Sequence, residues 1–314
     1  MPSAGKPTRL LLFLGPHFGV LFLKKIKKHP GALAYRVVAC SGDNDGYYGY
    51  ENVPEYCKKN RIECLDGPAH GQKELLEFCR SYGPAMILCG YYAKILPVEI
   101  LNLAADGAFN VHPGKLPWYR GSFPTAWAIL NNEQEIGISI HRMDSRIDTG
   151  PVVAQKMDAI LPDETGYALY KRSMELSAEY LFSFLPELLK KNYKSVDQTT
   201  IGKGSSYGRL ASHCRLDWKE AAVKIKNLIR VHAKPYFPAY SFIKNKMVLM
   251  NRCRVVNDPA MRPQNPGRVL EAATGRSFYV SCGDGAIEVT DYEVCPSGAN
   301  GKKETFIKKG VQLC

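Results

Sequence analysis

The sequence lacks the patterns that mark several common classes of protein. Its 10 cysteines form no C-x-x-C pair, and no group of Cys and His has the spacing of a zinc site. No G-x-G-x-x-G follows the first apolar run, because the turn reads LGPHFG and the bulky His17 fills the approach that a dinucleotide's pyrophosphate needs. Internal repeats are absent too. These absences count against a structural metal and against a nicotinamide or flavin enzyme.

Uninterrupted apolar runs are scarce as well. The apolar stretch near the N-terminus is broken by Gly15-Pro16-His17 and falls short of the roughly 20 apolar residues that span a bilayer. No small-x-small cleavage site follows it, which counts against a signal peptide. We expect instead a buried strand from Arg9 to Leu14 and then a helix. Scattered cysteines in a chain of 314 residues fit a reducing compartment, so the sequence predicts a cytoplasmic protein without a membrane partner.

Positive charge is in excess, with a formal net charge of +12. The excess is local, because residues 203–254 contain twelve Lys and Arg against only Asp217 and Glu220. A solvated basic face and a surface that recruits phosphate groups explain this stretch equally well. The charge therefore permits a nucleic acid or a polyanionic substrate without selecting either.

Short apolar strands alternate with amphipathic helices through the first two-thirds of the chain. RLLLFLG, YRVVACSG, AMILCGY and GAFNVHP read as strands, and helical segments separate them. This alternation predicts an α/β, doubly wound, Rossmann-like domain with a mostly parallel sheet. After about residue 198, short strands joined by Asn, Gly and Asp turns predict a small antiparallel barrel or sandwich. We expect the two domains to span residues 1–200 and 201–314.

Three polar residues stand where an α/β active site is expected. Asn110 and His112 are two apart at the end of one strand, so they point to the same side. Asp148 lies in an Asp-Thr-Gly turn between two apolar strands. Taken singly, each has an ordinary structural explanation, such as a packed histidine or an Asx turn. Together they supply a base, a carboxylate that orients it and an amide that can stabilise an oxyanion, which suits attack by an amine or water on a carbonyl.

These residues belong to a longer series of motifs. Asn110-x-His112 is followed by Leu116-Pro117-Trp118-Tyr119-Arg120-Gly121 and then by Asp148-Thr149-Gly150. In this order and spacing the sequence resembles the 10-formyltetrahydrofolate-dependent formyltransferases. The chain departs from that family's usual Trp-Pro-Gly at Phe237-Pro238-Ala239, and from its usual Ser-Leu-Leu-Pro at Gly114-Lys115-Leu116-Pro117. Neither departure falls on Asn110, His112 or Asp148.

The resemblance carries implications for fold and site. It implies N10-formyltetrahydrofolate as co-substrate, no metal, and an OB-like β-barrel as the C-terminal domain. His112 would act as the base, Asn110 as the oxyanion stabiliser and Asp148 as the orienting carboxylate. The pterin would lie near Cys89, Gly90, Tyr91, Tyr92, Met143, Asp144 and Asp148. The acceptor substrate would meet Lys115, Trp118, Tyr119, Arg120 and Tyr48. Strand-end packing would also account for Tyr91 and Tyr92, a structural turn for Trp118 and Tyr119, and an internal salt bridge for Arg120.

The acceptor amine is suggested by the segment CSGDNDGYYGYENVPEYCKKN. Methionyl-tRNA formyltransferases carry a basic insertion at this place, whereas here no lysine precedes Lys58. The segment and the HRM before the Asp148 loop resemble the sugar-nucleotide N-formyltransferases, which implies a nucleotide-linked amino sugar as substrate. The basic C-terminal stretch keeps tRNA as the alternative partner. A formyl-folate hydrolase and a non-catalytic module that senses folate or binds nucleic acid also stay open. The sequence leaves undecided the sugar, the amine position, the nucleotide and the oligomeric state, for which a homodimer is one option.

Overall fold

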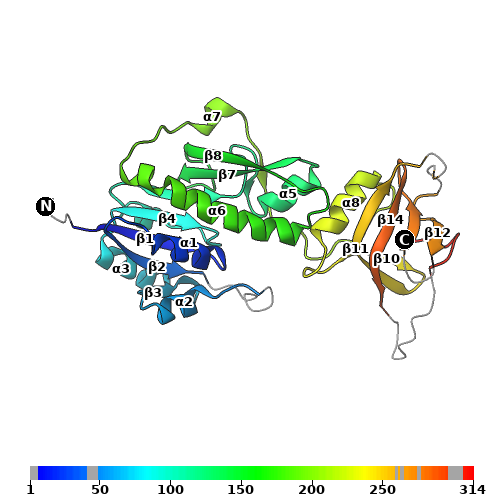
Figure 1. Cartoon of the computed structure of the whole chain (residues 1–314), viewed down its shortest axis with the longest axis horizontal. Helices are drawn as coiled ribbons and strands as arrows, with labels where there is room; N and C mark the ends of the chain where they lie inside the picture. The colour runs from blue at the N-terminus through cyan, green and yellow to red at the C-terminus, as the bar shows by residue number, and fades with distance from the viewer. Residues whose placement is uncertain (1–5, 41–48, 259–260, 262–264, 274–276, 296–306) are drawn as a thin grey trace. The chain divides into compact units, whose positions relative to one another are not determined.

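The computed structural model describes residues 6–40, 49–258, 261, 265–273, 277–295 and 307–314. The chain divides into two compact units (Figure 1). The first unit comprises Met1–Pro124, Glu135–Asp158 and Lys171–Gly208, and the second comprises Thr125–Gln134, Ala159–Tyr170 and Arg209–Cys314. The simpler division into residues 1–200 and 201–314 stays a prediction.

The first unit is built on a seven-stranded sheet. Its strands stand in the order β3-β2-β1-β4-β5-β7-β8, with β1 to β5 paired in parallel and β7 antiparallel to β5. Their bounds are β1 Thr8–Leu14, β2 Leu33–Ala39, β3 Cys64–Asp66, β4 Met86–Gly90, β5 Ala108–His112, β7 Glu135–Arg142 and β8 Val152–Ala159. A separate pair joins β6 Arg120–Gly121 to β9 Ser206–Tyr207 in parallel. The predicted α/β class and mostly parallel sheet are confirmed.

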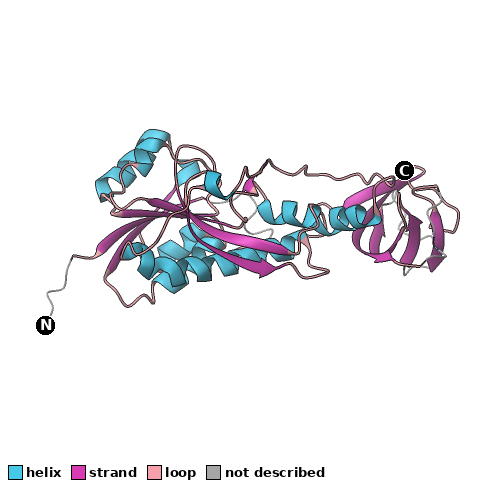
Figure 2. Cartoon of the chain, turned by 90° about the horizontal axis from the view of Figure 1, so that it is seen from above, coloured by secondary structure: helices cyan, strands magenta, loops and turns pink. Residues whose placement is uncertain are grey.

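Helices lie on both faces of this sheet (Figure 2). The helices of the first unit are α1 Phe18–Ile26, α2 Val53–Lys59, the 3₁₀ turn η1 Gly67–Ala69, α3 Gln72–Tyr82, α4 Val98–Leu101, the part of α6 Gly166–Leu189 from Lys171 onward, and α7 Gln198–Ile201. Apart from Pro124, helix α5 Pro124–Leu130 belongs to the second unit. The central strand β1 is covered on both sides, since Leu10 to Leu14 are all 0% exposed. Burial on both faces explains why this strand reads as a continuous apolar run. Each such side chain contributes about 1.5–3 kcal/mol to folding.

The strand order reverses between β1 and β4. From β1 the chain moves outward to β2 and β3, and then returns to β4 on the other side of β1. In doubly wound sheets, ligands bind beyond the carboxyl ends of the strands at this reversal. The topology therefore directs attention to the loops that follow β1, β4 and β5.

The second unit contains a five-stranded antiparallel sheet in the order β10-β11-β14-β13-β12. Its elements are helix α8 Ala222–Val231 and the strands β10 Ala239–Ile243, β11 Lys246–Val256, β12 Val269–Ala273, β13 Ser277–Ser281 and β14 Ala286–Val294. Ile225 and Ile229 of α8 share a buried core with Phe278 and Ile287 of the sheet. The antiparallel character is confirmed, whereas closure into an OB-like barrel stays a prediction. Within the described residues, no helix combines the length and apolar character that crossing a membrane requires.

Candidate active site

Polar side chains gather at the carboxyl end of β5. The alternation in AFNVH turns Asn110 and His112 to the same side of the strand. The antiparallel partner β7 places His141 opposite Asn110 and Ser139 opposite His112. The register of two strands thus brings four polar side chains together.

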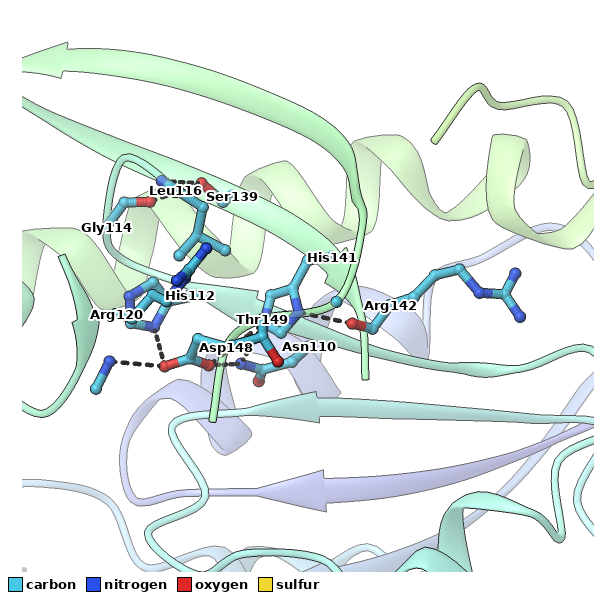
Figure 3. A network of polar contacts seen from close by, with 12 residues as sticks. Asn110, His112, Gly114, Leu116, Arg120, Ser139, His141, Arg142, Asp148 and Thr149 are labelled. Carbon is cyan, nitrogen blue, oxygen red and sulfur yellow. Dashed lines mark hydrogen bonds and ion pairs between the residues drawn. The ribbon is translucent and has the colours of Figure 1, made fainter. Parts of the chain in front are cut away.

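Asp148 reaches this group from the loop between β7 and β8 (Figure 3). Its Oδ2 accepts a hydrogen bond of 2.9 Å from the Gly121 amide and lies 3.4 Å from His112 Nδ1. Its Oδ1 lies 3.4 Å from Asn110 Nδ2 and 3.4 Å from His141 Nε2. The structure therefore brings together the three residues that the sequence singled out, although they are up to 38 residues apart.

Asp148 is held as a carboxylate. Burial alone would raise its pKa, since only 12% of the side chain is exposed. The facing rings of His112 and His141 and the amide of Gly121 outweigh burial and hold the pKa well below the usual range of an aspartate. The residue also has a φ of 53°, in the left-handed region that Asp and Asn tolerate better than most residues. A fixed negative charge therefore faces His112 at neutral pH.

The His112 ring is fixed from two sides. Its Nε2 lies 2.7 Å from the Tyr119 carbonyl oxygen, and the residue is 4% exposed. Because a carbonyl oxygen only accepts, Nε2 carries a proton and Nδ1 is the nitrogen that faces Asp148. The chain turns tightly around the ring at Gly114, where a Cβ atom would lie 2.5 Å from Nε2. Proton exchange at His112 therefore centres on Nδ1.

His141 is a member of the site that the sequence reasoning missed. Its Nδ1 donates to the Arg142 carbonyl oxygen at 2.8 Å. Its Nε2 lies 3.2 Å from Asn110 Nδ2 and 3.4 Å from Asp148 Oδ1. The signal was present in the HRM that precedes the Asp148 loop, but the sequence does not give the register that places its histidine opposite Asn110.

Gln198 is a second residue that the sequence did not single out. It begins α7 and is 1% exposed. Its Nε2 donates to the carbonyl oxygens of Asp148 and Gly150, each at 2.8 Å. No local pattern marks this glutamine, because its partners are about 50 residues away.

The aromatic side chains predicted to meet the pterin are engaged within the protein. The Tyr91 hydroxyl lies 3.0 Å from Ser173 Oγ and 3.1 Å from Ser177 Oγ of α6. The Tyr92 ring packs edge-on against Phe13 with centroids 5.2 Å apart, and burial raises its pKa. A role of Tyr91 and Tyr92 in folate binding stays a prediction.

The other residues predicted to bind folate are also buried or in contact with other groups of the protein. Cys89 and Gly90 are buried in β4, and burial raises the pKa of the Cys89 thiol above its usual range. Met143 packs beside the apolar cluster between α3, α4 and the sheet. Asp144 braces its own loop, because its carboxylate accepts from the Arg146 amide at 2.9 Å and from Thr149 Oγ1 at 2.8 Å. These contacts shape the loop that carries Asp148.

The predicted acceptor residues differ in exposure. Lys115 is exposed and Trp118 is 38% exposed, so both are accessible. Tyr119 is 8% exposed and stacks on Tyr207 with centroids 5.2 Å apart. Arg120 is half-buried and donates from Nε to Gln198 Oε1 at 2.9 Å. Tyr48 lies outside the described residues, and all five assignments stay predictions.

His17 stands in the turn that follows β1. It is 9% exposed, has a φ of 55°, and stacks on Tyr50 with centroids 5.3 Å apart. Neither ring nitrogen has a hydrogen-bond partner among the residues that the structure describes. Burial first, and then the nearby Lys171, lower its pKa below the usual histidine value. A neutral imidazole therefore occupies the turn at the strand reversal.

Possible metal ligands do not cluster in the described part of the chain. Within residues 6–40, 49–258, 261, 265–273, 277–295 and 307–314, no three His, Cys, Asp or Glu side chains are arranged to hold an ion.

The chain is similar to known proteins in its sequence and in its fold. Residues 28–185 match the "Formyl transferase" model, and residues 211–300 match the "Formyl transferase, C-terminal domain" model. A methionyl-tRNA formyltransferase of Caldanaerobacter subterraneus subsp. tengcongensis is 31% identical over 311 residues, covering 96% of this chain and 97% of that protein.

Two solved structures share the fold. The N-formyltransferase from Helicobacter canadensis, in complex with folinic acid and dTDP-3-aminofucose, has a TM-score of 0.74 at 21% identity, covering 91% of this chain and 100% of that one. WlaRD, a sugar 3N-formyl transferase, has a TM-score of 0.70 at 20% identity, covering 91% and 98%. Taken with the family models and the curated relative, these matches establish that the chain belongs to the formyltransferase family.

Proposed function

We propose that the protein transfers a formyl group from N10-formyltetrahydrofolate to the primary amine of a nucleotide-linked amino sugar in the cytoplasm. The observation that carries the formyl-transfer part is the contact network of Asn110, His112 and Asp148 in a chain of the formyltransferase family. The folate co-substrate supplies an activated formyl carbonyl. The residues of the network have the chemistry to assist attack on that carbonyl.

His112 and Asp148 act as one proton acceptor in this proposal. The amine that attacks the formyl carbon must lose a proton, and Nδ1 of His112 is the nitrogen able to take it. The imidazolium that results is stabilised by the Asp148 carboxylate at 3.4 Å. The proton then passes to the departing nitrogen of the donor, which returns the pair to its starting state.

Asn110 stabilises the negative charge that develops on the formyl oxygen. Its Nδ2 contacts Asp148 at 3.4 Å and His141 at 3.2 Å, and both bonds are long for an N–H donor. Since the residue is half-buried, one N–H can turn to a substrate oxygen while His141 keeps the amide oriented. Preorganised donors of this kind are worth about 3–4 kcal/mol of barrier.

The sugar acceptor is favoured by the composition of residues 41–57. This stretch contains no Lys or Arg, so it offers no cation to the phosphates of a tRNA acceptor stem. The exposed Trp118 offers an aromatic face for stacking on a sugar or a base. The Arg120 guanidinium, which uses Nε for Gln198, has the chemistry to bind a diphosphate through its terminal nitrogens. The fold-level likeness to sugar formyltransferases agrees with this choice but does not by itself select the acceptor.

Methionyl-tRNA is the second candidate acceptor, and the 31% identical relative favours it. The basic stretch of the C-terminal unit supports it less than the sequence suggests. Ion pairs within that unit join Lys224 to Glu220, Lys226 to Asp163, Lys234 to Glu293 and Arg254 to Glu288. Three of these four acids lie outside residues 203–254, so a count along the sequence overstates the positive field.

The acceptor is identified by a screen with the formyl-folate donor. UDP-, dTDP- and GDP-linked amino sugars and methionyl-tRNA are offered in parallel, and the gain of a formyl group is read by mass spectrometry. We expect an amino sugar to be formylated with a weak salt dependence. Formylation of methionyl-tRNA alone, with a rate that collapses as salt rises, would replace the sugar by tRNA. Release of formate without any acceptor would instead indicate a hydrolase, and donor binding without turnover a folate-sensing module.

A further inference from the structure

A segment between the two family matches makes direct contact with the candidate active site. This connecting segment, residues 197–207, lies between residues 28–185 and 211–300. Its strand β9 pairs with β6, and the Arg120 amide donates to the Ser205 carbonyl oxygen at 3.0 Å. The Tyr119 amide donates to Ser205 Oγ at 3.2 Å. The segment therefore fixes the turn of residues 119–121.

The turn of residues 119–121 makes hydrogen bonds to both His112 and Asp148. The Tyr119 carbonyl oxygen accepts from His112 Nε2, and the Gly121 amide donates to Asp148 Oδ2. Gly121 has a φ of 93°, and a Cβ at this position would lie 2.3 Å from the Tyr207 carbonyl oxygen. The close approach of β9 thus depends on glycine, and through this turn the connecting segment contacts both His112 and Asp148.

Gln198 provides a second and more direct contact between the connecting segment and the Asp148 loop. Its amide nitrogen donates to the carbonyl oxygens of Asp148 and Gly150, and its amide oxygen accepts from Arg120 Nε at 2.9 Å. The side chain therefore joins the Asp148 loop to the 119–121 turn (Figure 3 shows Asp148 and Arg120). Gln198 is buried, so the loss of its side chain would leave these carbonyl oxygens without their hydrogen-bond donor, which is costly.

The backbone conformation of Asp148 requires stabilising contacts of this kind. Its φ of 53° is a left-handed conformation that an L residue adopts at a cost, and such a conformation persists only where its surroundings fix it. The two hydrogen bonds from Gln198 fall on the carbonyl oxygen of Asp148 itself and on that of Gly150, on either side of the turn. Removing them would free the main chain while leaving the carboxylate, His112 and Asn110 chemically intact.

We propose that Gln198 is a positioning residue for formyl transfer, which holds the Asp148 carboxylate against His112 through the Asp148 main chain. This proposal rests on the proposed function, formyl transfer, only where it is tested by an activity measurement. Gln198 touches no substrate in this account. Within the connecting segment it is Gln198 that supports the active site.

The test compares Gln198→Met with the matched control Thr200→Ala. Methionine is close to glutamine in size and removes all three side-chain hydrogen bonds. Thr200 Oγ1, by contrast, donates at 2.7 Å to the Asp197 carbonyl oxygen in the same helical turn. We expect kcat of Gln198→Met to fall about 10²-fold, with the KM values for both substrates changed much less. Thr200→Ala should keep near wild-type turnover. Wild-type turnover in Gln198→Met, or an equal loss in Thr200→Ala, would overturn the proposal.

Two further measurements keep the proposal testable if activity or folding fails. In NMR spectra of the whole chain, the imidazole nitrogen signals of His112 should shift in Gln198→Met and stay in place in Thr200→Ala. This comparison needs no substrate, so it decides the role of Gln198 even if the wild-type protein formylates nothing. In Gln198→Glu, activity relative to wild type should rise in part as pH falls, because a carboxylate donates to neither carbonyl whereas a protonated carboxyl can donate its single O–H to one of them. Unshifted His112 signals, or a flat relative pH profile, would contradict the positioning role.

Discussion

The replacement Asp148→Asn removes one charge from the proposed acid–base pair with little change of shape. Asparagine is isosteric with aspartate and tolerates the left-handed φ of 53° that this position requires. Its side-chain oxygen can still accept from the Gly121 amide, now at 2.9 Å. Because the lowered pKa of Asp148 means that its ionised form stabilises the folded state, we expect the variant to fold with a melting temperature below that of the wild type.

The loss of rate can be worked out from the distance between Asp148 and His112. Two unit charges 3.4 Å apart interact with about 5 kcal/mol at an effective dielectric of 20. The imidazolium exists only while the amine proton is in transit, so this attraction lowers the barrier rather than the ground state. The asparagine dipole retains part of it, which leaves a loss of about 3–5 kcal/mol. Such a loss corresponds to a fall in kcat of about 10² to 10⁴-fold.

The assay is steady-state formyl transfer to the acceptor found by the screen, with the folded state checked by circular dichroism. The KM for the donor should change little, since the carboxylate acts on a charge that appears during the reaction. A folded Asp148→Asn protein that loses less than about fivefold in kcat would refute the reasoning, because the carboxylate would then contribute no more than one ordinary hydrogen bond.

Other changes test separate parts of the account. His141→Phe should lower kcat about 3- to 10-fold by releasing the Asn110 amide, and an unchanged rate would remove His141 from the site. Gly114→Ala should abolish activity or folding, since its Cβ would lie 2.5 Å from His112 Nε2, and a fully active variant would contradict this packing. His17 has a lowered pKa, so the unfolded chain binds its proton first and the free energy of unfolding should fall as pH drops below about 6.5. His17→Asn should flatten that part of the curve in urea titrations, and identical curves for the two proteins would show that His17 stays accessible to protons.

The sequence predicted those parts of the molecule that depend on local patterns. The buried run of β1 and its neighbours predicted a parallel sheet, and the two-residue spacing of Asn110 and His112 predicted their common side. The net charge of the basic stretch was harder to predict, because Glu288 and Glu293 form ion pairs with two of its residues from a strand that is distant in the sequence. His141 and Gln198 could not be placed, since strand register and a contact over some 50 residues are set by the packed tertiary structure.

Transfer of the formyl carbon from the folate donor to an amine at the Asn110, His112 and Asp148 network is the central step of the proposed function. It is tested most directly in a single turnover with donor labelled by ¹³C in the formyl group, followed by NMR. For the wild-type protein we predict that the label moves from the folate nitrogen to a new amide on the acceptor, and for Asn110→Ala and His112→Ala that it stays on the donor over the same time. Transfer at the wild-type rate by either variant, or no transfer by the wild type to any acceptor in the screen, would contradict the account.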